Sequence, residues 1–160
     1  MATAPPLVQV NAVKKHYSVT KGLILQRTIG QVKAVDGISF EIPEGQTYSL
    51  VGESGCGKTT TSRIILMVES PTEGDVYFEG QSIQNFSGAD QKKFRASVQA
   101  VFQDPWSSLN PRLKVGSIIS EPITAHRRAT KQEIKSEVNE LLRVVGLHSF
   151  HGDRYPHEFS

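Results

Sequence analysis

Apolar and polar residues alternate along much of the N-terminal part of the chain, as they do in strands that bury one face. The pattern predicts one strand over residues 7–17 and another over residues 32–42, with residues 18–31 as a loop between them. A turn at residues 43–45 then leads into a short strand over residues 46–51. These segments predict an N-terminal part built mainly of β-strands.

Helical and strand-like segments alternate in the next part of the chain. Apolar residues gather over residues 60–68, which predicts a helix, and a turn at residues 70–74 precedes a strand over residues 75–79. A short polar helix over residues 89–96 and a strand over residues 98–102 follow. Strands and mixed elements thus occupy the first hundred residues of the chain.

The remainder of the chain has a helical pattern, and its clearest element begins at Thr130. Thr130 and Glu133 have the spacing of a capping box, in which each side chain bonds the other residue's backbone N–H. Gly146 stands where a helix of this length would end. The helix carries one apolar face, made of Ile134, Val138, Leu141, Leu142 and Val145.

A glycine-rich segment separates the strand over residues 46–51 from the helix that follows it. Its residues are Gly52, Glu53, Ser54, Gly55, Cys56, Gly57, Lys58 and Thr59, which match the phosphate-loop pattern G-x-x-x-x-G-K-[ST]. A strand, a glycine-rich turn and a helix in this order point backbone N–H groups and the positive helix end at one place. We therefore predict a nucleotide site that also includes Thr60. Lys58 would reach the β- and γ-phosphates, and the Thr59 hydroxyl would ligate Mg²⁺.

Cys56 is the one cysteine of the chain and lies inside this loop. Its position beside the phosphates, at a helix N-terminus, favours modification of the thiol. The alternative is that the position simply tolerates many small residues. A single cysteine excludes an internal disulfide and fits a reducing compartment.

Charge and hydropathy exclude several other classes of protein. The net charge is +2 over 160 residues, and lysine and arginine form pairs at most, such as Lys14-Lys15, so nucleic acid is not an expected partner. The longest apolar run, residues 64–68, is too short to cross a membrane. The N-terminus lacks the order of a secretory signal. We expect a cytoplasmic protein whose membrane role requires a partner.

Several further segments carry a resemblance to a known family. They are residues 14–17, 32–40, 101–105, 108–112 and 154–160. With the phosphate loop, they make the chain resemble the ATP-binding subunits of ATP-binding-cassette (ABC) transporters, and among these the second ATPase subunit of bacterial dipeptide and oligopeptide importers. The resemblance implies an ABC-type P-loop NTPase fold, α/β, with antiparallel strands and an incomplete parallel core sheet before a helical subdomain. It divides the chain into residues 1–103 and 104–160.

The same resemblance assigns roles to residues outside the loop. Tyr17 matches the aromatic residue that stacks on adenine; the alternatives are an ordinary aromatic at a strand end, or stacking by His16. Gln103 matches a loop glutamine whose amide oxygen can ligate Mg²⁺, and a solvated loop residue is the alternative. Trp106 would lie near the surface that docks the membrane subunit, unless it packs under its own loop.

The resemblance also implies that part of the catalytic apparatus is absent. The family's signature segment begins at Phe159 and Ser160. The acidic strand that holds Mg²⁺, the glutamate that polarises the attacking water and the switch histidine have no counterpart in the chain. We therefore expect an N-terminal fragment that has no catalytic residue of its own, binds ATP and does not turn it over.

For the full-length subunit, the resemblance implies an ATPase that drives peptide import from the inner face of the membrane. Its expected cofactors are ATP and Mg²⁺, and its expected partners are permease subunits and a second ATP-binding subunit. One alternative is a non-catalytic nucleotide-binding fragment. Another is a small-molecule P-loop kinase, against which the Gln103-Asp104-Pro105 loop counts, because such a kinase needs an arginine-rich lid there.

Overall fold

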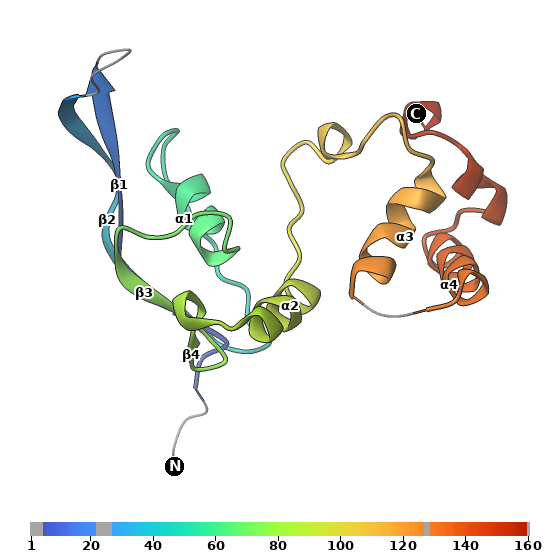
Figure 1. Ribbon diagram of the computed structural model, residues 1–160, viewed down its shortest axis with the longest axis horizontal. Helices are drawn as coiled ribbons and strands as arrows, with labels where there is room; N and C mark the ends of the chain where they lie inside the picture. Colours follow the sequence, from blue (N-terminus) through green and yellow to red (C-terminus); the bar gives the residue numbers. More distant parts are fainter. Residues whose placement is uncertain (1–4, 22–26, 127–128, 160) are drawn as a thin grey trace. The chain divides into compact units, whose positions relative to one another are not determined.

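The computed structural model describes residues 5–21, 27–126 and 129–159. The chain forms two compact units, Met1–Gln91 and Lys92–Ser160. The first unit contains the β-strands and the phosphate loop, and the second consists of helices and loops (Figure 1). The functional division expected after residue 103 stays a prediction.

An antiparallel sheet of four strands, in the order β2-β1-β3-β4, organises the first unit. The strands are β1 (Val8–Lys21), β2 (Arg27–Ile42), β3 (Glu73–Phe78) and β4 (Gln81–Ser82). β1 lies in the middle and pairs antiparallel with both β2 and β3. β1 and β2 form the long hairpin drawn in blue in Figure 1. The sheet agrees with the antiparallel part of the predicted fold.

This hairpin corrects the loop that was predicted over residues 18–31. β1 continues through residues 18–21, and Val19 lies opposite Gly30 in the ladder with β2. β-branched residues favour extended backbone, and pairing satisfies N–H and C=O groups that a loop would leave to water. The prediction of a loop was therefore wrong for the paired residues, and residues 22–26 lie outside the described part of the chain.

The hydrophobic core of the first unit lies between the sheet and the segments around it. Its buried residues include Val10, Val13, Val35, Ile64, Val76, Phe78 and Ile83. Helix α1 (Lys58–Ile65) contacts β2 and buries Thr61 and Ile64. The helix was predicted over residues 60–68 but ends earlier, because Met67 has φ +56°, a left-handed conformation that an α-helix cannot continue.

Two segments predicted as core strands do not join any ladder among the described residues. Residues 46–51 and 98–102 carry no strand assignment. Their apolar side chains stay in contact with solvent, with Val51 89% and Val101 91% exposed. A strand is stable only when a neighbouring strand takes up its hydrogen bonds. These two strand predictions were wrong for the described structure, because no described segment pairs with either one.

The second unit is built from helices and single turns. The boundary between the two units falls inside α2 (Gly88–Ser97), which matches the polar helix predicted over residues 89–96. The helices α3 (Val115–His126) and α4 (Lys131–Val144) follow it. Three 3₁₀ turns connect and follow them: η2 (Trp106–Ser108), η3 (Ser149–Asp153) and η4 (Pro156–Glu158). The sequence does not predict these turns, because they are too short to show a helical period. No helix in the described ranges is long and apolar enough to cross a membrane.

The caps predicted for the long C-terminal helix are present at both ends of α4. The Thr130 backbone N–H donates to Glu133 Oε2 over 2.7 Å, and the Glu133 N–H donates to Thr130 Oγ1 over 3.3 Å. Gly146 has φ +78° just beyond the helix, and the Leu147 N–H donates to the Leu142 carbonyl over 2.9 Å. The capping prediction is confirmed.

The predicted apolar face of α4 is buried only in part. Val138 and Leu142 are buried, and Leu142 is 1% exposed. Leu141 is 43% exposed and Val145 is 68% exposed. α4 contacts α3 and η3, so the residues turned towards these two elements form the core of the second unit.

Leu142→Ala should lower the free energy of unfolding of the second unit by about 2–5 kcal/mol, because it opens a cavity in this small core. Denaturant unfolding followed by circular dichroism measures the loss. Leu141→Ala, at the exposed neighbour on the same helix, is the matched control and should change the free energy by about 0.5 kcal/mol or less. An equal loss for both variants would contradict the assignment of Leu142 to the core.

Candidate nucleotide-binding site

Gly57 seats the glycine-rich loop on the β1–β2 hairpin. Its φ is +94°, and a Cβ atom built on it would lie 2.2 Å from the carbonyl oxygen of Ala34 in β2. No L side chain could occupy that space without moving the backbone, so glycine is required for both conformation and proximity. Gly57 is also the N-cap residue of α1. The contact therefore determines where α1 starts relative to the sheet.

Lys58 folds back over the loop that precedes it. Its Nζ donates to the carbonyl oxygens of Gly52 and Glu53 over 2.7 and 2.6 Å, and lies 3.4 Å from Cys56 Sγ. The ammonium group therefore lies over the loop rather than in open solvent. A phosphate oxygen entering the loop can replace the carbonyls as acceptor, with a stronger charge-assisted bond.

The N-terminal turn of α1 is free of negative charge. It carries no acidic residue, and Gly57 provides no side-chain hydrogen bond to the first amides. Thr61 is buried, and its hydroxyl donates to the Gly57 carbonyl over 3.0 Å, which ties the turn to the loop. Thr59 is exposed on the same turn. Because no acidic residue of this turn neutralises the helix dipole, the turn can accept an anion.

These groups fit a magnesium–nucleotide polyphosphate by their chemistry. Around the loop, an ammonium group and the unneutralised helix turn favour the negative charge of phosphate oxygens. The exposed Thr59 can supply one hydroxyl oxygen to Mg²⁺, an ion that commonly takes few protein ligands and completes its shell with phosphate and water oxygens. The described residues contain no cluster of three or more His, Cys, Asp or Glu side chains suited to a metal.

Tyr17 lies at the edge of this site, on the hairpin. Its hydroxyl donates to Glu69 Oε2, just beyond the end of α1. Lys15 Nζ lies 5.2 Å from the centroid of the Tyr17 ring, and Tyr17 is 39% exposed. The structure thus connects the predicted adenine-stacking residue to the helix that follows the phosphate loop.

His16, the alternative stacking residue, is engaged on the other face of β1. Its Nε2 lies 3.0 Å from Asp36 Oδ1, and its side chain is 13% exposed. Neighbouring residues of a strand point to opposite faces, so His16 and Tyr17 cannot serve the same side of the hairpin. The bonds of Asp36 to Lys33 and His16 lower the pKa of that carboxyl.

The Tyr17–Glu69 pair perturbs the protonation of both partners. The hydrogen bond to Glu69 raises the pKa of the Tyr17 phenol, because a phenolate would face a carboxylate. The same bond lowers the pKa of Glu69, and the hydrogen bond from Arg63 acts in the same direction. At neutral pH, the phenol is therefore a donor and the carboxylate an acceptor.

Gln103 belongs to the second unit, and its role as a metal ligand stays a prediction. It is exposed and directly precedes a tight turn. In that turn Asp104 Oδ1 accepts from the backbone N–H groups of Trp106 and Ser107 over 3.1 and 3.3 Å. The expected loop after Gln103 is present, shaped by this carboxylate.

Three residues of the site were not predicted from the sequence: Lys15, Arg63 and Glu69. Lys15 belongs to one of the lysine pairs noted in the sequence, and its side chain is only 19% exposed. The available signal was its position two residues before Tyr17, which places both on one face of β1. Arg63 lies in the last turn of α1. Glu69 reaches the site through the path of the chain after α1, for which the sequence has no local signal.

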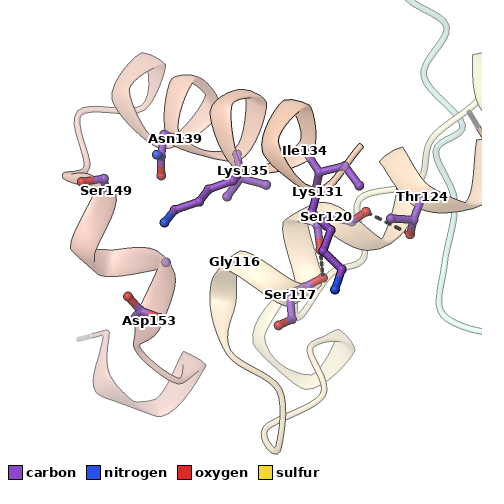
Figure 2. A pocket seen from close by; sticks show the side chains of 12 residues that line it. Gly116, Ser117, Ser120, Thr124, Lys131, Ile134, Lys135, Asn139, Ser149 and Asp153 are labelled. Carbon is purple, nitrogen blue, oxygen red and sulfur yellow. Dashed lines mark hydrogen bonds between the residues drawn. The ribbon is translucent and has the colours of Figure 1, made fainter. Parts of the chain in front are cut away.

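The second unit contains a separate groove of about 320 Å³ among α3, α4 and η3 (Figure 2). Lys131 and Lys135 line it from α4, and Ser117 and Ser120 line it from α3. The Ser120 hydroxyl is already engaged, because it donates to the Ser117 carbonyl over 2.8 Å. The groove includes none of the predicted site residues.

The sequence matches the protein-family model described as ABC transporter over residues 35–160. The chain therefore belongs to the ABC transporter family. This confirms the family indicated by the phosphate loop and the later motifs.

Two curated relatives are similar to the chain over nearly its whole length. The chain is 47% identical over 160 residues to the oligopeptide transport ATP-binding protein AppF of Bacillus subtilis (strain 168), covering 99% of the chain and 48% of AppF. It is 44% identical over 155 residues to the dipeptide transport ATP-binding protein DppF of Escherichia coli (strain K12), covering 97% of the chain and 46% of DppF. The chain spans about half the length of these relatives.

A solved structure shares the fold. It is described as a dimeric post-hydrolysis state of the ATP-binding cassette MJ0796 bound to ADP and Pi. It matches with a TM-score of 0.73 at 25% identity, over 96% of this chain and 63% of that chain. The α/β fold predicted for the chain is thus the fold of an ABC ATPase cassette.

Lys58→Ala should weaken ATP binding about ten- to a hundredfold, because it removes a charge-assisted bond to the β- and γ-phosphates. Titration with a fluorescent ATP analogue measures the change. Lys92→Ala, which removes an exposed lysine from α2, should bind as the wild type does. Equal affinity for the Lys58 variant and the wild type would remove the loop from the site.

Mg-ATP should slow alkylation of Cys56, because bound phosphates would cover the exposed thiol. Cys56 is the only cysteine, so the rate of a maleimide reaction reports on the loop without background. Mg²⁺ without nucleotide is the control and should leave the rate unchanged. A rate that ATP does not alter would place the nucleotide away from this loop.

Proposed function

We propose that the chain is the nucleotide-binding part of an ATP-binding, energy-coupling subunit of an ABC importer for dipeptides or oligopeptides. The observation that carries the proposal is the seated loop. Lys58 and the first turn of α1, which carries no acidic residue, lie together at this loop, and Tyr17 of β1 is bonded to the segment after α1. Membership of the ABC transporter family and the names of the relatives supply the transport context.

In this proposal, Lys58 holds the β- and γ-phosphates and the α1 turn neutralises their charge. The Thr59 hydroxyl would hold Mg²⁺, for which Gln103 is the other proposed ligand, and the ion would supply positive charge to the phosphates. Tyr17 stacks on the base, a contact worth roughly 1–3 kcal/mol that tolerates any base. The loop residues 52–57 and Thr60 complete the cradle.

We further propose that these 160 residues bind ATP without turning it over. Phosphoryl transfer needs a metal-binding carboxylate and a residue that orients the attacking water. The family resemblance assigns neither role to a residue of this chain. Each such group contributes a factor of roughly 10² to 10⁴ in rate, so hydrolysis depends on further segments.

The proposed partners are membrane-spanning permease subunits and a second ATP-binding subunit, at the inner face of the membrane. A groove of about 440 Å³ in the second unit supports the first of these. Its apolar lining includes Trp106, Leu109, Pro111, Pro156 and Phe159. Trp106 is exposed there, as expected of a residue that another protein covers.

Phosphate release should separate binding from turnover. The 160-residue chain should bind ATP and release no phosphate above background. The same residues continued by the second half of AppF should hydrolyse ATP, and Lys58→Ala should abolish that activity. Multiple turnovers by the 160-residue chain, lost on Lys58→Ala, would overturn the proposal that hydrolysis needs further segments.

A further inference from the structure

The edge of the site carries a set of charged side chains that the proposed function does not use. The Tyr17 side chain is surrounded by Lys15 of β1, Arg63 of α1 and Glu69 of the segment after α1. We propose that Glu69 and Lys15 are positioning residues that hold the Tyr17 ring in the orientation required to stack on the base. The inference rests on the proposed function, because it assumes that ATP binds at the loop with its base at Tyr17.

Glu69 is itself held in place before it contacts Tyr17. Its backbone N–H donates to the Arg63 carbonyl over 3.2 Å, which fastens it to the last turn of α1. Its Oε1 lies 3.3 Å from Arg63 Nη1, and its Oε2 accepts from the Tyr17 hydroxyl. The carboxylate thus ties the phenol to the same helix whose N-terminus faces the phosphates. The proposed base and phosphate contacts are therefore both connected to α1.

Lys15 supports the ring from one of its faces. Its Nζ donates to the Ser70 carbonyl over 2.7 Å and lies 3.9 Å from Glu69 Oε2, while standing 5.2 Å from the ring centroid. An ammonium group over an aromatic face attracts the ring and draws electron density from it. Such a ring stacks well on an electron-rich purine with its other face. Tyr17 keeps 39% of its surface exposed, which leaves room for that contact.

A fixed ring binds a base more tightly than a mobile one. A free tyrosine side chain must lose rotational freedom when a ligand packs against it, and this loss weakens binding. Here the hydrogen bond and the cation–π contact order the ring before the nucleotide arrives. The network should therefore raise affinity only for ligands that carry a base.

A purely structural role predicts a different pattern. If Glu69 merely joined β1 to α1, its loss would disturb the loop as well, and every phosphate ligand would bind less tightly. Comparing ATP with inorganic tripolyphosphate separates the two roles, because tripolyphosphate lacks the base. The ratio of the two dissociation constants is the diagnostic quantity.

The experiment measures both dissociation constants in the presence of Mg²⁺ for the 160-residue chain and its variants. Glu69→Ala should weaken ATP binding about three- to tenfold, the range that ordering one side chain represents, and leave tripolyphosphate unchanged. Tyr17→Phe, which removes only the hydroxyl, should give the same result. The double variant should lose no more than either single one, because both changes remove one interaction.

Two further variants complete the comparison. Glu69→Gln keeps an acceptor oxygen for the phenol and should lose less than Glu69→Ala. Glu73→Ala breaks a similar ion pair, Lys14–Glu73 at 2.7 Å, elsewhere between β1 and β3, and should leave the ratio at the wild-type value. If Glu69→Ala fails to fold, Tyr17→Phe carries the test.

The outcomes distinguish the inference from the proposed function. Equal weakening of ATP and tripolyphosphate by Glu69→Ala and Tyr17→Phe would overturn the positioning role and leave the nucleotide site intact. Additive losses in the double variant would overturn it as well. A wild-type chain that binds neither ligand would overturn the proposed function and, with it, the inference.

Discussion

The contact between Gly57 and the Ala34 carbonyl is the constraint on which the rest of the site depends. A Cβ at Gly57 would lie 2.2 Å from that oxygen, so the loop can approach β2 only because the residue has no side chain. The same residue caps α1, and Lys58 follows it directly. A larger residue would therefore shift the loop, the helix dipole and the lysine together. The positions of the loop, of α1 and of Lys58 are therefore set relative to the β1–β2 hairpin.

The ammonium group of Lys58 and the first turn of α1 favour an anion at the phosphate loop. Among the described residues, the partners of the Lys58 ammonium group are neutral acceptors of its own loop, which do not cancel its charge. Two carboxylates of the first unit have cationic partners of their own: Glu69 pairs with Arg63, and Glu73 pairs with Lys14. Their bonds lower the pKa of both carboxyls, Glu69 chiefly through Tyr17 and Glu73 through Lys14. An incoming phosphate therefore meets an unneutralised cation.

The proposed site binds the nucleotide at its phosphates and at its base, through contacts of comparable strength. A charge-assisted bond from Lys58 contributes about 1.5–3 kcal/mol, and stacking on Tyr17 contributes roughly 1–3 kcal/mol. Neither end alone gives tight binding, so their separation must match the length of the ligand. That separation is set within the first unit, because α1 begins at the loop and the chain after it returns to Tyr17 through Glu69.

The sequence by itself determined the features that depend on neighbours along the chain. These are the phosphate loop, the capping box at Thr130, the end of α4 at Gly146 and the family. The tertiary structure decided what depends on distant partners: residues 18–21 became strand because β2 pairs with them, whereas residues 46–51 stayed outside any described ladder for want of a pairing strand. It also decided that Glu69 meets Tyr17 across 52 positions of the sequence. Local patterns report helix caps and tight turns, because the interacting groups are a few residues apart. Strand pairing and the contacts of a side chain depend on how the whole chain folds back on itself.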